Sequence, residues 1–308
     1  MVKSVYGNKQ ISGTPSLLDN VMYKYKSLLP RIALERLYIA MIRPVIEYGD
    51  LIYENCSARL KNDLNQIQRK AGLICTGGYK HTENQTLMQE LGWESLETRR
   101  KNHKIVQTFK IVTHIYPDHL FDLLSPRQNT AYNLGNPHLF NTQLRRTSSS
   151  YNSFFPSASR LWNSLPLSIT NATSVDNLKS KIVGPRPKTN FYYRLCTGKA
   201  GIWLTRLRLE LSALNYHRYT YNFINSPNCN NCPNQLETIY YYFFACNQYQ
   251  LARQTLFDRL KTEIGIDSNT VTLSNLTNIL IHGLVQTEYI LPLFNIVTSY
   301  LQATNRFT

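Results

Sequence analysis

The stretch SARLKNDLNQIQRKAGLICTGG, residues 57–78, decides what kind of fold this chain of 308 residues adopts. Its apolar side chains recur at helical steps, at Leu60, Leu64, Ile67, Ala71 and Ile74. That spacing predicts an amphipathic helix with one apolar face. Ser57 is a favoured N-cap residue, and Gly77-Gly78 is expected to end the helix. Since the apolar seam covers only about two heptads, we expect a packed helix rather than a coiled coil.

Helical patterns also lie on both sides of this stretch. Upstream, a helix is predicted from Leu29, with Pro30 in its first turn, and Pro44 is expected to kink or end it. Downstream, we predict a short helix over 84–91, and a longer one capped by Ser95 that runs to about Ile115. Further helices are predicted over 203–214 and after Gln248. The sequence therefore predicts a mainly α protein.

Composition divides the chain into four parts. Residues 1–28 are polar, contain Gly and Pro, and are expected to form a loose lead-in. Residues 29–183 are predicted to form a helical unit with a loop-rich connector. The connector begins near Leu120, where Pro and Asn interrupt the helical pattern, so loops and short extended pieces are expected around one short helix holding Arg160. Residues 184–200 are a predicted linker, and 201–308 a small cysteine-containing unit of helices and irregular structure.

The charge of the chain is unevenly distributed. Lys and Arg number 34 against 19 Asp and Glu, a formal net charge of +15. Residues 1–110 hold 17 basic and 10 acidic residues, 111–200 hold 10 and 3, and 201–308 hold 7 and 6. An excess of this kind favours an anionic partner such as RNA or DNA. The alternative is a basic face that is simply solvated.

Several function classes lack their residues in this sequence. No two aspartates are adjacent, as a two-metal polymerase or nuclease site would favour. No glycine-rich phosphate loop and no Gly-x-Ser-x-Gly motif is present, so neither a catalytic residue nor a small-molecule substrate is predicted. No signal peptide is visible, and the apolar stretches 38–46 and 289–301 are too short to span a bilayer. We expect an intracellular protein of the nucleus or cytoplasm that has no membrane partner.

The most specific local motif is Cys229-Asn-Asn-Cys232, followed by Cys246. In a reducing compartment, such a close cysteine pair indicates a metal more than a disulfide. Zinc takes four nitrogen or sulfur ligands, and three cysteines supply three of them. His217 is the nearest histidine in the sequence and is the candidate for the fourth. The alternative is three cysteines with no metal.

Short motifs stand in a fixed order along most of the chain from about Leu29. They are RPVIEYG at 43–49, IQRKA at 67–71, LGW at 91–93, SFFP at 153–156, LWNSLP at 161–166, WLTRLRLELSALNYHR at 203–218, YNFINSPNC at 221–229, Glu237-Thr238, Cys246 and TNRF at 304–307. In this order they resemble the C-terminal region of LINE-type (non-LTR) retrotransposon reverse transcriptases. The resemblance implies a thumb, a connector and a cysteine-rich tail.

The same resemblance assigns a role to the basic residues, because the thumb of such a polymerase grips the template–primer backbone. The candidate nucleic-acid-binding residues are Arg99, Arg100, Lys101, Lys104, Arg145, Arg146, Arg160, Arg206 and Arg208. Cations neutralise phosphates, and aromatic side chains near Arg145–Arg160 could stack on unpaired bases. The alternative is that these aromatic residues are core and the charges are solvated.

Two departures from the family pattern limit what is implied. The aromatic-x-Asp-Asp catalytic motif of the palm is not in this chain, and the histidine that usually precedes the last cysteine is replaced by Tyr241. Zinc binding is therefore expected to be weak. The sequence predicts a remnant of a reverse transcriptase without its catalytic palm, which binds nucleic acid non-specifically. The alternatives are a structural or protein-interaction module, or a chain whose polymerase lies in adjacent sequence.

Overall fold

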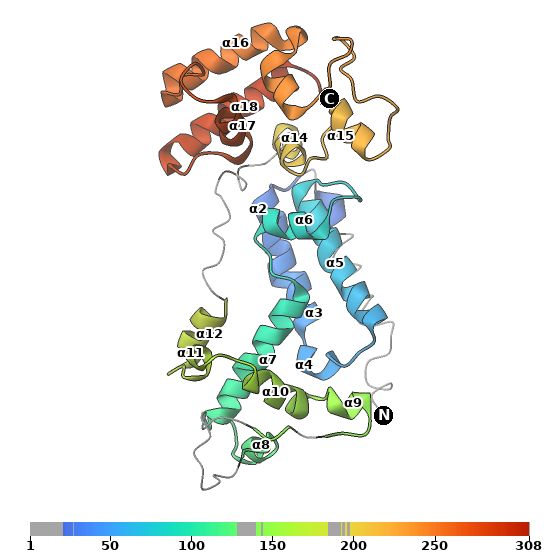
Figure 1. The fold of residues 1–308 in the computed structure, drawn as a ribbon, viewed down its shortest axis with the longest axis vertical. Coiled ribbons are helices and arrows are strands. Elements are labelled where there is room, and N and C mark those ends of the chain that lie inside the picture. Colours follow the sequence, from blue (N-terminus) through green and yellow to red (C-terminus); the bar gives the residue numbers. More distant parts are fainter. Residues whose placement is uncertain are drawn as a thin grey trace. The chain divides into compact units, whose positions relative to one another are not determined.

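The computed structural model describes residues 21–26, 28–127, 140–142, 144–183, 192, 195 and 198–307. These ranges are mainly α-helical and contain no β-strand, only the isolated bridges Pro126–Phe140 and Asn228–Leu236 (Figure 1). The prediction of a mainly α protein is thereby confirmed. Most of the predicted lead-in, 1–28, and of the predicted linker, 184–200, lies outside the described residues.

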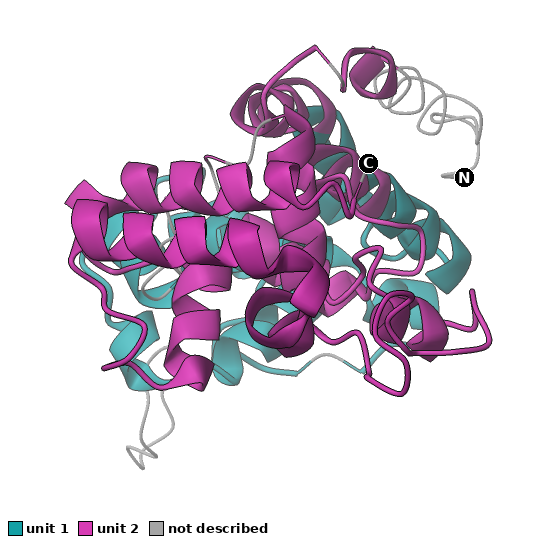
Figure 2. Ribbon diagram, turned by 90° about the horizontal axis from the view of Figure 1, so that it is seen from above, with its two compact units in different colours: residues 1–15, 43–68, 94–187 teal, residues 16–42, 69–93, 188–308 magenta. Residues whose placement is uncertain are grey.

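The chain forms two compact units, each assembled from separate stretches of sequence (Figure 2). Unit 1 comprises residues 1–15, 43–68 and 94–187, and unit 2 comprises 16–42, 69–93 and 188–308. This grouping differs from the predicted division into 29–183 and 201–308, because residues 16–42 and 69–93 belong with the C-terminal part. One reason is that Glu90 forms ion pairs with both Arg31 and Arg208.

Unit 1 is built around the long helix α7. Its elements are α3 (Arg43–Glu47), α4 (Asp50–Tyr53), the first part of α5 (Ala58–Thr76), α7 (Leu96–Val112), α8 (His119–Asp122), α9 (Ser148–Tyr151), α10 (Phe154–Asn163), α11 (Leu167–Thr170) and α12 (Val175–Val183). Helices α10 and α12 pack on α7, and Phe109 and Trp162 meet in the core with ring centroids 6.4 Å apart. The later helices α10 and α12 therefore pack on α7, which precedes them in the sequence.

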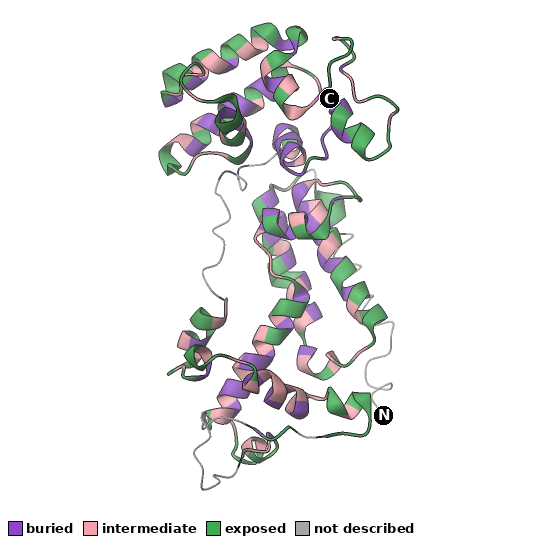
Figure 3. Cartoon of the chain, viewed as in Figure 1, coloured by how far each residue is buried: buried purple, intermediate pink, exposed green. Residues whose placement is uncertain are grey.

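Unit 2 has a larger apolar core, formed mostly by its C-terminal helices (Figure 3). Its elements are α2 (Arg31–Leu37), η2 (Tyr38–Ile42), the end of α5, α6 (Asn84–Leu91), α14 (Gly198–Arg208), α15 (Asn215–Thr220), η3 (Tyr241–Ala245), η4 (Asn247–Tyr249), α16 (Gln250–Arg259), η5 (Leu260–Ile264), α17 (Leu273–His282), η6 (Thr287–Tyr289) and α18 (Ile290–Ala303). Helix α18 packs against α14 and α16. The polar segment 221–238, which lies between α15 and η3, carries no regular helix.

The ends of the early helices follow their capping residues. The backbone N–H of Leu60 donates to Ser57 Oγ over 3.4 Å, and α5 ends before Gly77, whose φ of 65° favours glycine. The backbone N–H of Thr98 donates to Ser95 Oγ over 3.1 Å. Helix α7 ends at Val112, slightly before the predicted end. Local hydrogen bonds therefore determine these boundaries.

Three helix predictions need correction. The helix predicted over 203–214 is α14, which begins earlier, at Gly198, and ends at Arg208. Pro44 does not end the first helix, because helical conformation continues from Arg31 to Glu47 with a π-helical stretch at Tyr38–Ile42. A π turn holds one more residue than an α turn, and here it precedes a proline that cannot donate a backbone hydrogen bond, so the helix continues past it. The connector after Leu120 is also more helical than predicted, because the apolar face of α10 packs in the core of unit 1.

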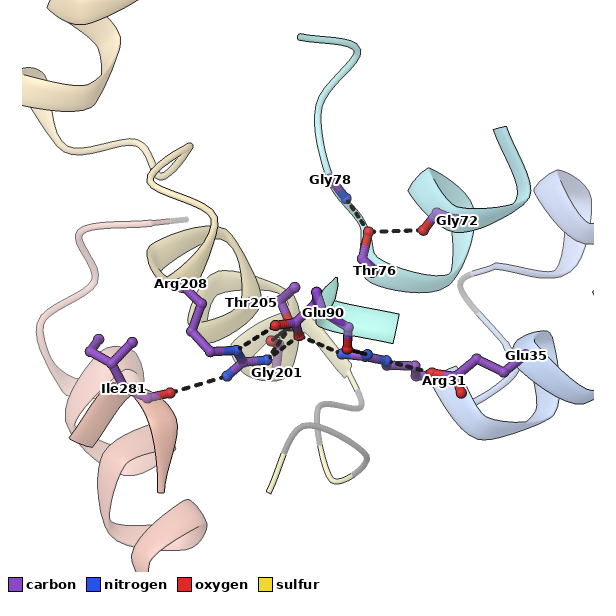
Figure 4. A network of polar contacts seen from close by, with 10 residues as sticks. All are labelled: Arg31, Glu35, Gly72, Thr76, Gly78, Glu90, Gly201, Thr205, Arg208 and Ile281. Carbon is purple, nitrogen blue, oxygen red and sulfur yellow. Dashed lines mark hydrogen bonds and ion pairs between the residues drawn. The ribbon is translucent and has the colours of Figure 1, made fainter. Parts of the chain in front are cut away.

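A buried ion network joins four helices of unit 2 (Figure 4). Glu90 Oε1 accepts from Arg31 Nη1 at 2.8 Å and from Arg208 Nη2 at 2.7 Å. Arg31 also donates to Glu35, and Arg208 also donates to the Ile281 carbonyl. Because every charged member is buried, these charges stabilise the unit only as a complete set.

No single described helix is long and apolar enough to cross a membrane. The bent pair formed by Leu273–His282 and Thr287–Ala303 passes the same length and composition test only when its two parts are taken together, with an angle of 74° between them.

Candidate metal centre and basic residues

Three cysteine sulfurs of unit 2 meet at one point. Cys246 Sγ lies 3.9 Å from both Cys229 Sγ and Cys232 Sγ, and all three sulfurs lie within 4.8 Å of one another. A disulfide would need about 2.05 Å. Four sulfurs placed about 2.3 Å from a tetrahedral zinc ion lie about 3.8 Å apart, which is close to the observed spacing. The three cysteines could therefore hold a metal ion such as zinc.

A short turn presents the first two cysteines on the same side. The Cys229 N–H donates to the Gln235 carbonyl at 2.8 Å, and the Gln235 N–H returns to the Cys232 carbonyl at 3.4 Å. Asn234 has a φ of 64°, a left-handed conformation that asparagine adopts more readily than most residues. The backbone therefore fixes the spacing of this cysteine pair without help from a regular helix or strand.

The π turn η3 brings the third cysteine to this pair. Its last carbonyls are held by Arg253, which donates to Phe244 O at 2.6 Å and also to Cys246 O. Tyr241 begins the same turn, and its hydroxyl donates to the sulfur of Cys232. That hydrogen bond lowers the pKa of the Cys232 thiol, whereas burial raises the pKa of Cys246 to about 12.

A polar cluster ties this centre to the end of the chain. Glu237 is buried, and both of its carboxylate oxygens accept from Arg306 at 2.6 Å. Glu237 also accepts the backbone N–H of Asn215 at 2.6 Å, and Asn215 Nδ2 donates to the Asn228 carbonyl beside Cys229 at 2.6 Å. Sequence reasoning used Glu237 and Arg306 for the resemblance but did not assign them a role. Their role here is to hold the cysteine turn in place.

The structure does not bring His217 to the cysteines. Its Nδ1 lies 2.9 Å from Ser212 Oγ and accepts the Ser212 N–H, and burial lowers its pKa to about 4. Among the described residues, the metal-ligating atoms grouped at this point are the three sulfurs alone. Tyr241, rather than a histidine, lies beside them.

Three of the nine predicted nucleic-acid-binding residues are buried. Arg100 and Lys104 lie on the buried side of α7, where Lys104 donates to Ser157 Oγ at 2.9 Å and pairs with Glu54. Arg208 is part of the Glu90 network. Lys104 and Arg208 already have partners and cannot reach a phosphate without leaving them, and Arg100 is buried beside Lys104 on the same side of α7.

Two further candidates are engaged at the surface. Arg99 pairs with Glu47 and lies 3.4 Å from Glu94. Arg206 Nε donates to the Gly77 carbonyl at 2.9 Å, and its guanidinium lies over the ring of Tyr79, 4.1 Å from the centroid. These contacts hold both side chains in one place.

The remaining four candidates are more accessible. Lys101, Arg145 and Arg146 are exposed, whereas Arg160 is half-buried with its guanidinium 3.6 Å from the centroid of the Tyr151 ring. Next to this segment lies an open pocket of about 590 Å³ in unit 1. It is lined by hydroxyls and an amide as well as apolar groups: Leu51, Ile52, Asn55, Thr147, Ser149, Ser150, Ser153 and Phe154.

No model of a known protein family matches this chain, and neither a curated protein nor a solved structure matches it. The fold and the geometry of its side chains therefore carry what can be inferred about function.

Proposed function

We propose that this chain is a remnant of a LINE-type reverse transcriptase, without a catalytic palm among its residues, that binds RNA or DNA non-specifically through basic residues. The observation that carries the proposal is an acid-free segment: residues 123–175 contain Arg127, Arg145, Arg146 and Arg160 but no Asp or Glu. The formal charge of this segment is therefore positive throughout, which favours contact with phosphates. An intracellular site, in the nucleus or cytoplasm, is part of the same proposal.

The surroundings of the Arg145-Arg146 pair support this reading. Both residues are exposed, and the hydroxyls of Thr147, Ser149 and Ser150 line the adjoining pocket. Arginine and hydroxyl side chains supply many of the protein–phosphate hydrogen bonds that position a nucleic acid without reading its sequence. The buried candidates, Arg100 and Lys104 among them, are assigned instead to the stability of unit 1.

The metal centre supports a structural part of the proposal. A zinc ion held by Cys229, Cys232 and Cys246 would clamp the cysteine turn to η3, and catalysis is not required of it. Binding is expected to be weak because the fourth donor nearby is the Tyr241 hydroxyl, whose pKa is raised further above its usual value by its hydrogen bond to Cys232. A protonated phenol is a poor ligand for zinc.

Nucleic-acid titrations at several salt concentrations test the proposal. We expect log K to fall with log[salt], with a slope of about −0.9 per phosphate contacted on a duplex. In the double variant Arg145→Gln/Arg146→Gln, the slope should shrink by up to about two such contacts. The matched control is Lys179→Gln/Lys181→Gln, which removes the same charge from exposed positions of unit 1.

The control variant should bind more tightly than the arginine variant. Equal losses in the two variants would mean that only overall charge matters and would refute the assignment to Arg145 and Arg146. An absence of salt-sensitive binding to RNA, DNA or a hybrid duplex would refute the proposed function. It would leave the structural or protein-interaction module.

A further inference from the structure

Another segment without Asp or Glu lies in unit 2, in the part of the chain whose net charge is close to zero. Residues 211–236 contain no Asp or Glu, and they hold seven asparagines. The segment includes α15 and the turn that carries Cys229 and Cys232. None of the nine predicted nucleic-acid-binding residues falls within it. Its distinguishing feature is aromatic rather than basic.

Four large aromatic side chains of this segment are exposed. Tyr216 is 41% exposed, Tyr219 46%, Tyr221 38% and Phe223 57%. Tyr216 and Tyr219 are three residues apart on α15, so they lie on the same side of the helix. Figure 3 colours most of α15 and the turn after it as exposed. We call Tyr216, Arg218, Tyr219, Tyr221 and Phe223 the α15 aromatic surface.

This exposure does not come from a loose segment. His217 and Asn215 on the same short helix are buried, and their hydrogen bonds to Ser212 and to Asn228 anchor the helix from beneath. The Phe223 N–H donates to the Arg218 carbonyl at 2.9 Å, which fixes the turn that follows. The backbone is therefore held while each of the four aromatic residues stays 38–57% exposed to solvent.

The polar and charged side chains around the four aromatic rings indicate which kind of partner fits this surface. Arg218 is exposed on α15, and the His81 ring lies edge-on to Phe223 with centroids 5.9 Å apart. Exposed amides also follow along the segment, including Asn222 and Asn225. Aromatic faces stack on unpaired bases, amides hydrogen-bond to base edges, and a cation contacts phosphate. A duplex offers no free base faces along its length, so this set of groups fits a single strand.

We propose that the α15 aromatic surface binds single-stranded nucleic acid, with bases stacked on Tyr216, Tyr219, Tyr221 and Phe223 and a phosphate on Arg218. This inference rests on the proposed nucleic-acid binding and adds the form of nucleic acid and the residues that select it. The exposed arginines of unit 1 bind by charge, whereas this surface binds by stacking. The two contributions can therefore be measured separately.

A comparison of two oligonucleotides isolates the stacking contribution. One is a 12-nucleotide single strand of mixed sequence, and the other is an abasic sugar–phosphate strand of the same length and charge. The full chain should bind the base-containing strand at least about five-fold more tightly, since stacking on one aromatic residue is worth about five-fold or more. Both strands should show the same dependence on salt.

The variant Tyr216→Leu/Tyr219→Leu/Phe223→Leu removes three of the four rings, leaves Tyr221 in place and keeps the surface apolar. We expect its affinity for the base-containing strand to fall most of the way to that of the abasic strand, while its affinity for the abasic strand and for a duplex stays unchanged. The control is Tyr48→Leu, which removes a ring that is 74% exposed in unit 1. Circular dichroism and thermal melting check that each variant folds.

Equal binding of the two strands by the unaltered chain would overturn the inference, and so would a folded triple variant with unaltered preference. In either case the surface would be left for a protein partner, and salt-sensitive binding through Arg145 and Arg146 would still stand. If no probe binds at any salt concentration, the proposed function fails and this inference fails with it.

Discussion

Replacing Glu90 by Gln should destabilise unit 2 more than any other single change of charge in the Glu90 network. Glu90 accepts three side-chain hydrogen bonds, one from Arg31 and two from Arg208, and the side chains of all three residues are almost completely buried. A glutamine of the same shape offers one acceptor oxygen and turns an N–H₂ group toward N–H donors. The Arg208 guanidinium would then have no carboxylate to neutralise it, although it would keep its hydrogen bonds to the Ile281 carbonyl and to Thr205 Oγ1.

The size of the effect follows from the burial. Removing one partner of a buried ion pair costs about 3–5 kcal/mol, because the remaining charge stays out of water. Arg31 keeps Glu35, so the uncompensated charge in Glu90→Gln is mainly that of Arg208. In Arg208→Met, by contrast, Glu90 keeps Arg31, and the methionine is apolar. The cost of Arg208→Met should therefore be the smaller of the two.

Urea unfolding followed by circular dichroism, and by tryptophan fluorescence with Trp162 of unit 1 replaced by Phe in every variant, measures both costs, because the remaining Trp93 and Trp203 belong to unit 2. The control is Glu83→Gln, an exposed position of unit 2 next to the first residue of α6, where we expect a change within about 0.5 kcal/mol. A cost below about 1 kcal/mol for Glu90→Gln would refute the reasoning. So would a larger cost for Arg208→Met than for Glu90→Gln.

The same network predicts a pH dependence. Burial by itself raises the pKa of Glu90, but Arg208 and Arg31 outweigh it and lower the pKa below its ordinary value of 4.5. A carboxyl with a lowered pKa contributes stability that is fully present above about pH 4.5 and is lost as the pH falls through the folded-state value. The difference in stability between the unaltered chain and Glu90→Gln should therefore shrink in acid. A difference that grows below pH 4.5 would contradict this assignment.

Three further outcomes are expected. Tyr241→His should raise the zinc content of the purified chain above that of the unaltered protein, and Cys246→Ser should lower it, as measured by metal analysis. One full equivalent of zinc in the unaltered chain would show that a fourth ligand is not lacking. Arg306→Met should cost about 3 kcal/mol in urea unfolding, because Glu237 would lose its guanidinium inside the protein. Gly77→Ala should cost at least about 1 kcal/mol, since its φ of 65° is left-handed and the new Cβ would lie 2.7 Å from Ile202 Cγ2; an unchanged unfolding midpoint would contradict this.

Helix positions were largely predictable from the sequence because their signals are local. Ser57 and Ser95 cap helices through hydrogen bonds that span three residues, and α6 has its predicted bounds. Helices α10 and α12 were less predictable, since their apolar faces are stabilised by packing on α7. The grouping of residues 16–42 with the C-terminal part was not predictable, because it depends on partners such as Glu90 and Arg208, 118 residues apart.

For the basic residues of α7, the sequence spacing itself separates the buried cations from the exposed one. Leu96, Arg100, Lys104 and Thr108 are four residues apart, and all four are buried, so the two cations occupy the inward side of α7. Lys101, one position further along, is exposed. A cation on a helix is therefore a candidate for nucleic-acid contact only when the apolar periodicity does not place it on the buried side of the helix.

At the cysteine centre, the cysteine spacing predicts the observed grouping of three sulfurs, but the predicted fourth ligand, His217, is not part of that group. The Cys229-x-x-Cys232 spacing is local, and the turn that it predicts is present. A fourth ligand is a matter of tertiary structure, and the nearest histidine in sequence, His217, is occupied by Ser212.

Net charge and surface charge are different quantities in this chain. Three of the predicted nucleic-acid-binding cations, Arg99, Lys104 and Arg208, are held in ion pairs with Glu47, Glu54 and Glu90, which lie far from their partners in sequence. Residues 123–175 and 211–236 contain no carboxylate with which a cation could pair locally. The first of these segments exposes arginines and the second exposes aromatic rings. Both proposed binding surfaces lie in segments without carboxylates, whereas several of the cations that contribute to the total of +15 are used by the fold in ion pairs.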